Sequence, residues 1–199
     1  MHHDTAMTVW ALVGLGAWHG LNPGMGWLFA VALGLQEEDR RAVWRTLAPL
    51  AVGHAAAVAL VLAAALAIGR VIPLVTLRWS SALLLVAFGL WRLASTRHPR
   101  WGGMRVGFRD LTIWSFLMAS AHGAGLMLLP LVVGGPAPTT AVDGIVATLV
   151  HTVAYLAVTG AIAALVYEKF GLGMLRRAWL NVDLLWATGL VVAGVVILL

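Results

Sequence analysis

The sequence predicts an all-α membrane protein with six transmembrane helices, arranged as a 3+3 inverted repeat. Three observations lead to this fold class. Of 199 residues, 61% are hydrophobic and only 11% are charged, an apolar fraction that no soluble domain of this length needs. Six segments stay apolar over the roughly 20 residues that a helix needs to cross a bilayer. The two halves of the chain also resemble each other weakly, so residues 1–199 are expected to form a single polytopic membrane domain.

The six predicted spans are separated by short connections. They cover about 8–34, 47–69, 73–95, 111–133, 141–167 and 179–199. The third span begins least clearly, because Pro73 and Arg78 lie at its start. The first apolar segment has neither a basic leader nor a convincing cleavage site, so it is expected to remain in the membrane.

The placement of lysine and arginine predicts the orientation. Eleven of the thirteen basic residues fall in or beside the 1–2, 3–4 and 5–6 connections, as Arg40, Arg105 and Arg177 do. Short cytoplasmic loops are enriched in these residues, so both termini are expected outside the cytoplasm, in a membrane of the bacterial inner-membrane kind. Basic residues confined to short loops argue against nucleic-acid binding, and the absence of cysteine excludes disulfides and thiolate metal sites.

The internal repeat is carried by histidines. The two groups of three spans cover about 8–95 and 111–199. His19 in span 1 corresponds to His122 in span 4, and each is followed by glycine. His54 in span 2 corresponds to His151 in span 5. Because three is odd, the second group enters the membrane from the opposite side, as in secondary transporters whose sites lie at the midplane between interrupted helices.

Each group also carries a proline that is expected to interrupt its first helix. Pro23 has no N–H to donate to the His19 carbonyl, and Pro130 has none for the Leu126 carbonyl. Free carbonyls at membrane depth are tolerated only where they face protein or a wet cavity, so helices 1 and 4 are expected to break near the midplane. Three glycines in span 1 favour the close approach of another helix: Gly16, Gly20 and Gly24.

The four histidines are predicted to lie at similar depth in the membrane. Three lie near the centres of their spans, and His54 lies roughly 6 Å off centre at 1.5 Å per residue. Intramembrane ionisable groups are rare and usually mark pathways, although each histidine can also serve as a structural hydrogen-bonding group. Met25 lies six residues after His19 and Met127 lies five residues after His122, and each offers a thioether. The predicted metal ligands are therefore His19, Met25, His54, His122, Met127 and His151.

Further polar residues are expected to line an ion path. Asn22 and Pro23 form the expected break in span 1, and Asp143 lies at the outer end of span 5. Polar side chains recur at helical spacing within span 5, which predicts a stripe that either lines the path or hydrogen-bonds neighbouring helices: Thr148, His151, Thr152, Tyr155 and Thr159.

The donor types bear on the identity of the ion. No carboxylate accompanies the cluster, and imidazole with thioether suits copper(I), whose single charge is less costly to bury than two. Nickel(II) and cobalt(II) stay open, because imidazole also suits them. At the N-terminus, His2 and His3 predict a second site, since a histidine third in the chain can join the amine and two backbone nitrogens in square-planar binding of copper(II) or nickel(II). The alternative is a chain start without any role in metal binding.

The motif HGLNPGMG, followed by VGHAAAV, resembles the NicO nickel/cobalt transporter family of the LysE-like six-span superfamily. That family carries a His-x-x-x-Pro-Gly-His pattern in its first span and a histidine beside glycine in its second. The residues that match these positions are His19, Pro23, Gly24 and His54. Met25 replaces the family's second histidine with a softer ligand. The likeness covers about 14–60 and, more loosely, 115–160. It implies a six-span transporter of a transition metal.

The predicted function is transmembrane transport of copper, nickel or cobalt by alternating access, with the ion as substrate, the lipid bilayer as partner, and no enzyme activity or organic cofactor. One alternative is a membrane protein that binds b-type haem through paired histidines. Another is a small-solute exporter whose histidines relay protons. The metal, the direction, the coupling ion and the choice between monomer and homo-oligomer are left open by the sequence.

Overall fold

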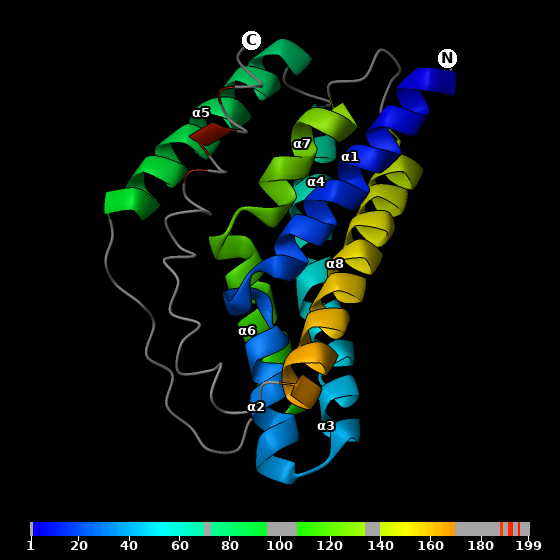
Figure 1. The fold of residues 1–199 in the computed structure, drawn as a ribbon. Coiled ribbons are helices and arrows are strands. Elements are labelled where there is room, and N and C mark those ends of the chain that lie inside the picture. Colours follow the sequence, from blue (N-terminus) through cyan, green and yellow to red (C-terminus); the bar gives the residue numbers. More distant parts are fainter. Residues whose placement is uncertain are drawn as a thin grey trace.

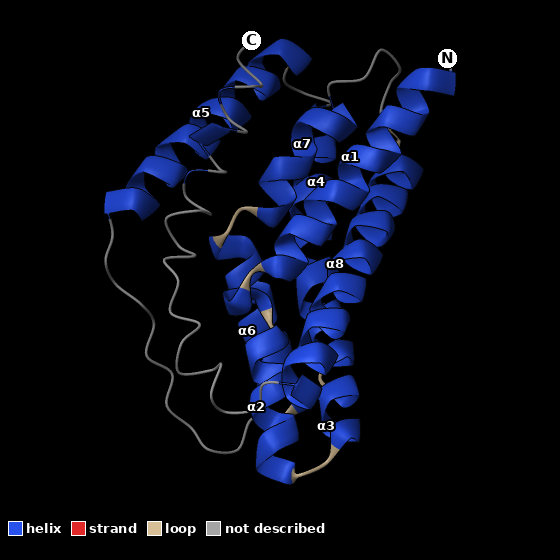
Figure 2. Ribbon diagram, in the orientation of Figure 1, coloured by secondary structure: helices blue, strands red, loops and turns tan. Residues whose placement is uncertain are grey.

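The described part of the chain is helical. A computed structural model describes residues 2–69, 73–94, 107–133 and 140–169, together with positions 188, 191, 192 and 195. The elements are α1 (His2–Leu21), η1 (Pro23–Met25), α2 (Trp27–Glu37), α3 (Arg40–Arg45), α4 (Leu47–Gly69), α5 (Leu74–Ala94), α6 (Phe108–Ala121), α7 (Ala124–Val133) and α8 (Ala141–Lys169). Helices make up all regular structure in these residues, which confirms the all-α class (Figure 2).

Within the described residues, two helical segments are long and apolar enough to cross a membrane: Arg40–Ile68 and Ala141–Lys169. The boundaries of three predicted spans agree closely with observed helices. α4 coincides with the predicted second span, and α5 and α8 match the third and fifth within two residues at each end. The predicted sixth span, 179–199, lies outside the described residues apart from the four positions already named.

The first predicted span is broken between α1 and α2. Asn22 caps the 3-10 turn η1, because its side-chain oxygen accepts the Gly24 N–H at 2.8 Å. Gly26 follows with φ 144°, a backbone angle that residues with a side chain rarely adopt. The His19 carbonyl is not free as expected: it accepts the Asn22 N–H at 3.2 Å. A tightened last turn of this kind satisfies the acceptor that Pro23 cannot serve.

The fourth predicted span is also broken, but not where expected. α6 ends at Ala121, and a turn at His122 and Gly123 separates it from α7. Gly123 has φ 67°, in the left-handed region that favours glycine. α7 then continues through Pro130, so the expected break at that proline is wrong. The chain leaves its helical path where a glycine makes the required backbone conformation inexpensive, and it tolerates the lost hydrogen bond at the proline.

Packing brings the two halves of the sequence together. α1 lies along α8, while α4 lies along α6 and α7 and also touches α8 (Figure 1). Glycines make the α1–α8 contact close. A Cβ at Gly16 would collide with the His151 carbonyl, and one at Gly20 would lie 2.6 Å from the Tyr155 carbonyl oxygen. The third glycine of the predicted ridge, Gly24, lies in η1 and takes no part in this contact.

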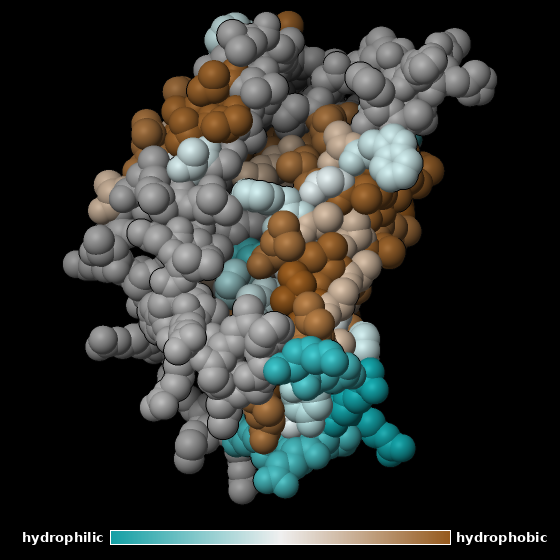
Figure 3. Space-filling view, in the orientation of Figure 1, coloured by the Kyte–Doolittle hydropathy of each residue, from teal (hydrophilic) through white to brown (hydrophobic). Residues whose placement is uncertain are grey.

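Charged side chains gather at one end of the molecule, around the α2–α3 connection and the end of α8 (Figure 3). Two exposed ion pairs lie there, Arg40 with Glu168 at 2.7 Å and Arg45 with Glu37 at 2.6 Å. Beyond this end the described helices expose large apolar side chains such as Leu60 of α4. A polar end beside an apolar belt is the pattern expected of helices that enter a bilayer.

Candidate functional site

Three histidines from three helices meet in the interior. His19 of α1, His54 of α4 and His151 of α8 have no exposed surface. Ring centroids lie 5.0 Å apart for His19 and His151, 5.2 Å for His54 and His151, and 5.7 Å for His19 and His54. The His54 and His151 rings are nearly parallel, and the His19 ring stands on edge to both. The structure thus brings into contact three of the four histidines that the sequence singles out.

The fourth histidine, His122, lies close enough to interact electrostatically with His19, and it is buried as well. These two histidines have equivalent local settings: each lies beside a helix end that precedes a break. In each, Nδ1 lies 2.8 Å from the carbonyl oxygen four residues earlier, that of Leu15 and that of Met118. A carbonyl only accepts, so Nδ1 is the donor in both rings. When the rings are neutral, Nε2 then carries the lone pair, which is the form that binds a metal.

His54 and His151 have a different setting. Both ring nitrogens of each are buried, and among the described residues none has a hydrogen-bond partner. The Leu12 carbonyl lies beside His151, but not in hydrogen-bonding geometry. A neutral imidazole always has one N–H to donate, and a buried donor without an acceptor costs on the order of 1–3 kcal/mol. Such groups require a reason, and the binding of an ion is one.

Tyr155 connects the histidines to the break in span 1. It follows His151 by one turn of α8, and its ring stacks on the His54 ring with centroids 4.1 Å apart. Its hydroxyl donates to the Met25 carbonyl at 2.6 Å. The phenol therefore joins α8 and α4 to the backbone of η1. The sequence anticipated Tyr155 as a polar group on this face of the helix, but not its contact with His54.

The spacing of the three rings suits a shared ion. Metal–nitrogen distances of about 2.0–2.1 Å in a tetrahedral site place the centroids of ligating imidazoles roughly 5.2 Å apart. The observed separations of 5.0, 5.2 and 5.7 Å bracket that value. Within the described residues, however, no three histidine, aspartate or glutamate side chains aim their ligating atoms so as to hold an ion. The ring positions fit, and rotation of the rings is needed to direct their nitrogens at one point.

The predicted methionine ligands lie in the same core. Met25 and Met127 are both buried and pack in the cluster that includes Tyr155. Thr148 is buried too, and its hydroxyl donates to the Gly144 carbonyl at 2.8 Å, which is a local bond within α8. The Thr152 hydroxyl is buried and, among the described residues, has no hydrogen-bond partner. The polar stripe of α8 therefore faces the interior of the bundle.

Other predicted residues have structural roles or lie apart. Asp143 is exposed and engaged at the start of α8, where Oδ2 accepts the Thr140 N–H at 2.8 Å and the Thr140 hydroxyl at 2.7 Å. These contacts form a helix cap, which accounts for the carboxylate without an ion. His2 and His3 lie in the first turn of α1. The predicted square-planar site would require that turn to unwind, because it uses the backbone nitrogens.

Some residues near the site carry no signal in the sequence. Leu50 is fully buried, and its carbonyl accepts the hydroxyl of Ser115 at 2.8 Å, which ties α4 to α6. Gly53 lies against α6 so closely that a Cβ would collide with the Thr112 carbonyl. A single serine or glycine among apolar residues is too common for its spacing to reveal such a contact.

Comparison of the chain with protein-family models, curated proteins and solved structures finds no match.

Proposed function

We propose that the protein is a membrane permease for a transition-metal ion, which binds at His19, His54 and His151 and crosses the bilayer as the substrate. The observation that carries this proposal is the meeting of three fully buried imidazoles from α1, α4 and α8, with ring centroids 5.0–5.7 Å apart. Buried ionisable groups within apolar helices are expensive and tend to mark pathways. His122, Met25 and Met127 are buried as well and offer one further imidazole and two thioethers.

The packing supports the six-span inverted repeat that belongs to this proposal. Exchange of the two groups maps span 1 onto span 4 and span 2 onto span 5. The α1–α8 contact then maps onto the contact of α4 with α6 and α7, and the α4–α8 contact maps onto itself. Both broken spans carry their histidine next to the break, with the same bond from Nδ1 to the carbonyl four residues earlier. Reciprocal contacts of this kind are what an inverted repeat produces.

The charge of the site favours copper(I) over nickel(II) or cobalt(II). The described residues bury histidine, threonine, serine and asparagine, but no aspartate or glutamate. A site of neutral donors leaves the charge of its ion uncompensated in an apolar surrounding, and the cost rises steeply with that charge. Imidazole and thioether are also donors that suit a soft, singly charged ion.

A haem site is less well supported by this geometry. Two imidazoles on opposite faces of a haem hold their centroids roughly 6.4 Å apart, with the macrocycle between them. His19 lies within 5.7 Å of both other rings, in the space that a macrocycle between His54 and His151 would occupy. The purified protein should therefore show no Soret band when haem is supplied, whereas a strong band would favour the haem alternative.

The direct test is metal binding by purified protein. Copper(I), nickel(II) and cobalt(II) are titrated against the parent protein, His54→Gln, His151→Gln and the control His98→Gln, which alters a histidine of the predicted 3–4 connection. Loss of one ligand should weaken binding at least about tenfold, since even changes behind a ligand cost 10–100-fold. The control should bind as the parent does. Equal affinity in all four proteins would refute the proposed site.

A further inference from the structure

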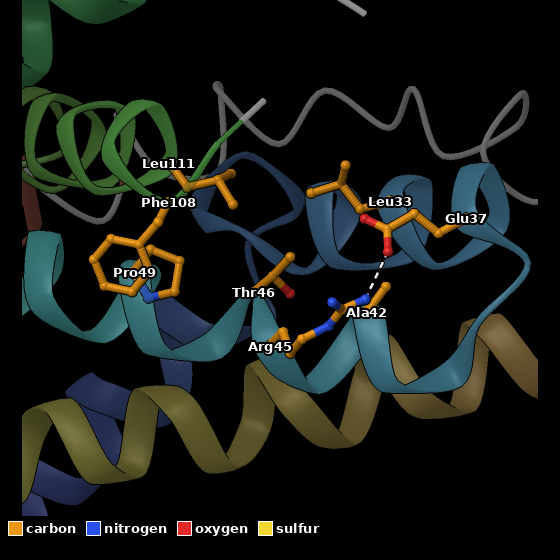
Figure 4. A pocket seen from close by; sticks show the side chains of 8 residues that line it. All are labelled: Leu33, Glu37, Ala42, Arg45, Thr46, Pro49, Phe108 and Leu111. Carbon is orange, nitrogen blue, oxygen red and sulfur yellow. Dashed lines mark hydrogen bonds and ion pairs between the residues drawn. The ribbon is translucent and has the colours of Figure 1, made fainter. Parts of the chain in front are cut away.

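A pocket of about 270 Å³ opens at the charged end of the bundle, between α2, the α3–α4 junction and α6 (Figure 4). Thr46, Pro49 and Leu111 form buried parts of its wall. Glu37 and Arg45 stand exposed beside it and are joined by an ion pair of 2.6 Å. The pocket therefore leads from the polar end of the molecule toward the apolar interior.

The pocket lies close to the histidines along α4, where the lining residue Pro49 precedes His54 by five residues. Leu50 comes one turn before His54 on α4, and Ser115 comes one turn after the pocket residue Leu111 on α6. The Ser115 hydroxyl donates to the Leu50 carbonyl at 2.8 Å, so the two residues hold α4 and α6 together. The Leu50 side chain packs on Gly26, where an added Cβ would lie 2.6 Å from Leu50 Cδ1. Leu50 and Ser115 therefore form a hydrogen-bonded layer one turn of α4 before His54.

Tyr155 holds the layer in place from the side of α8. Its hydroxyl donates to the Met25 carbonyl at 2.6 Å and would lie 3.1 Å from a Cβ at Gly26. Its ring lies on the ring of His54. A single side chain thus fixes the backbone on which Leu50 rests and limits the rotation of one proposed ligand. That rotation is the movement by which the rings would turn their nitrogens toward an ion.

Charged side chains form ion pairs beside the pocket. Arg45 lies 2.6 Å from Glu37 and 3.6 Å from Asp39, so two carboxylates accompany one guanidinium. Exposed pairs of this kind contribute little to stability. The lining of the pocket itself carries one carboxylate, Glu37, and one guanidinium, Arg45, so it has no net charge.

We propose that this pocket is the inner mouth of the ion path, and that Tyr155 is the latch of a one-layer barrier of Leu50, Ser115 and Tyr155 between the mouth and the histidines. Breaking the hydrogen bond from Tyr155 to Met25 releases η1, so that the Leu50 side chain can move away from Gly26. Tyr155 is a positioning residue, because it acts through His54 and η1. The inference rests on the proposed function for the identity of the cargo, but the barrier can be tested without any metal.

The test measures access through the barrier. The chain contains no cysteine, so Ser115→Cys introduces a single thiol within the layer, and Leu33→Cys introduces one at the mouth of the pocket. Inside-out vesicles containing either protein are treated with a membrane-impermeant thiol reagent. Each thiol is combined with Tyr155→Phe, which keeps the ring and removes the hydroxyl. The matched control is Tyr167→Phe, at the only other tyrosine of the chain.

We expect the thiol at position 33 to react in every background and the thiol at position 115 to react slowly in the parent. Tyr155→Phe should accelerate the second reaction roughly fivefold to tenfold, as loss of one buried hydrogen bond implies, and Tyr167→Phe should leave it unchanged. Leu50→Ala provides a second route to an open layer and should also accelerate it. Rapid labelling at 115 in the parent would overturn the barrier. Equal slow labelling with Tyr155→Phe and Leu50→Ala would overturn the latch.

Metal binding by the same variants separates this inference from the proposed function. Copper(I) titration reports on the cargo alone, because His54→Gln should weaken binding at least about tenfold whether or not the barrier opens. If labelling becomes faster in a protein that binds no metal, the role of Tyr155 in the barrier is supported and the proposed metal substrate is refuted. If the histidines bind metal but labelling does not respond to the variants, the proposed metal substrate is supported and the role of Tyr155 in the barrier is refuted.

Discussion

The α1–α8 contact provides the sharpest test of the packing on which the site depends. Gly20→Ala places a Cβ 2.6 Å from the Tyr155 carbonyl oxygen and 2.8 Å from the Cβ of Val158. The first distance is about 0.9 Å short of an ordinary contact of ~3.5 Å, and a backbone atom cannot move aside alone. Gly14→Ala is the matched change in the same helix, because no atom lies within 4 Å of its added Cβ.

The magnitude follows from the comparison of these two variants. Both gain the same helix propensity, on the order of 1 kcal/mol, so this contribution cancels in the difference. What remains is the cost of overpacking, about 2–3 kcal/mol for a clash with backbone. For a chain of this size that corresponds to a difference of roughly 4–12 °C in the melting temperature.

The assay is thermal unfolding of both variants in the same detergent, followed by copper(I) titration. Gly14→Ala should melt at or slightly above the parent temperature and bind normally. Gly20→Ala should melt lower and bind more weakly, because separation of α1 from α8 moves His19 away from His151. If the two variants melt at the same temperature, α1 does not lie on α8 as described and the histidine cluster loses its basis.

Two further changes test the cap and the second glycine contact. Asp143→Ala removes the acceptor for Thr140 at the start of α8, so it should lower the melting temperature by a few degrees. The affinity for metal should stay unchanged. A drop in affinity would instead indicate that the carboxylate takes part in the ion path. Gly53→Ala should destabilise the protein as strongly as Gly20→Ala, because its Cβ would collide with the Thr112 carbonyl of α6. Gly144→Ala is the control. Its Cβ meets only a flexible leucine methyl at 3.3 Å, so this variant should melt like the parent.

The sequence predicts helix positions well because length and apolarity alone specify them. Residues 47–69 form α4 as expected, since an uninterrupted apolar run of that length has few alternatives. The sequence misplaces the break in span 4, because a proline is a stronger sequence signal for a helix break than a single glycine. Pro130 removes one hydrogen bond within α7, whereas Gly123 adopts φ 67° and lets the chain turn beside His122.

The sequence predicts the depth of the histidines in the membrane, but not the direction in which each side chain points. Counting residues along a helix places His54 and His151 at similar heights, yet it does not say which face of each helix looks inward. That is decided by tertiary contacts such as Gly16 against the His151 carbonyl, which locks α1 and α8 in one rotation. The same limit explains why Ser115 carries no signal: its bond to the Leu50 carbonyl exists only once α4 and α6 are packed.

The glycine contacts also bear on how such a bundle would move. Gly20 packs α1 on α8, and Gly53 packs α4 on α6. Each contact joins a helix of the first predicted group of three spans to a helix of the second. Rocking one group of three spans against the other would have to break both contacts of backbone on backbone, which close packing resists. The easier division joins α1 with α8 and α4 with α6. His19 and His151 then move together, and His54 and His122 change their distance from them. Under the proposed function, the number of imidazoles around the ion would then differ between the two states, and a soft ion that accepts few ligands tolerates that difference better than one that needs a fixed geometry.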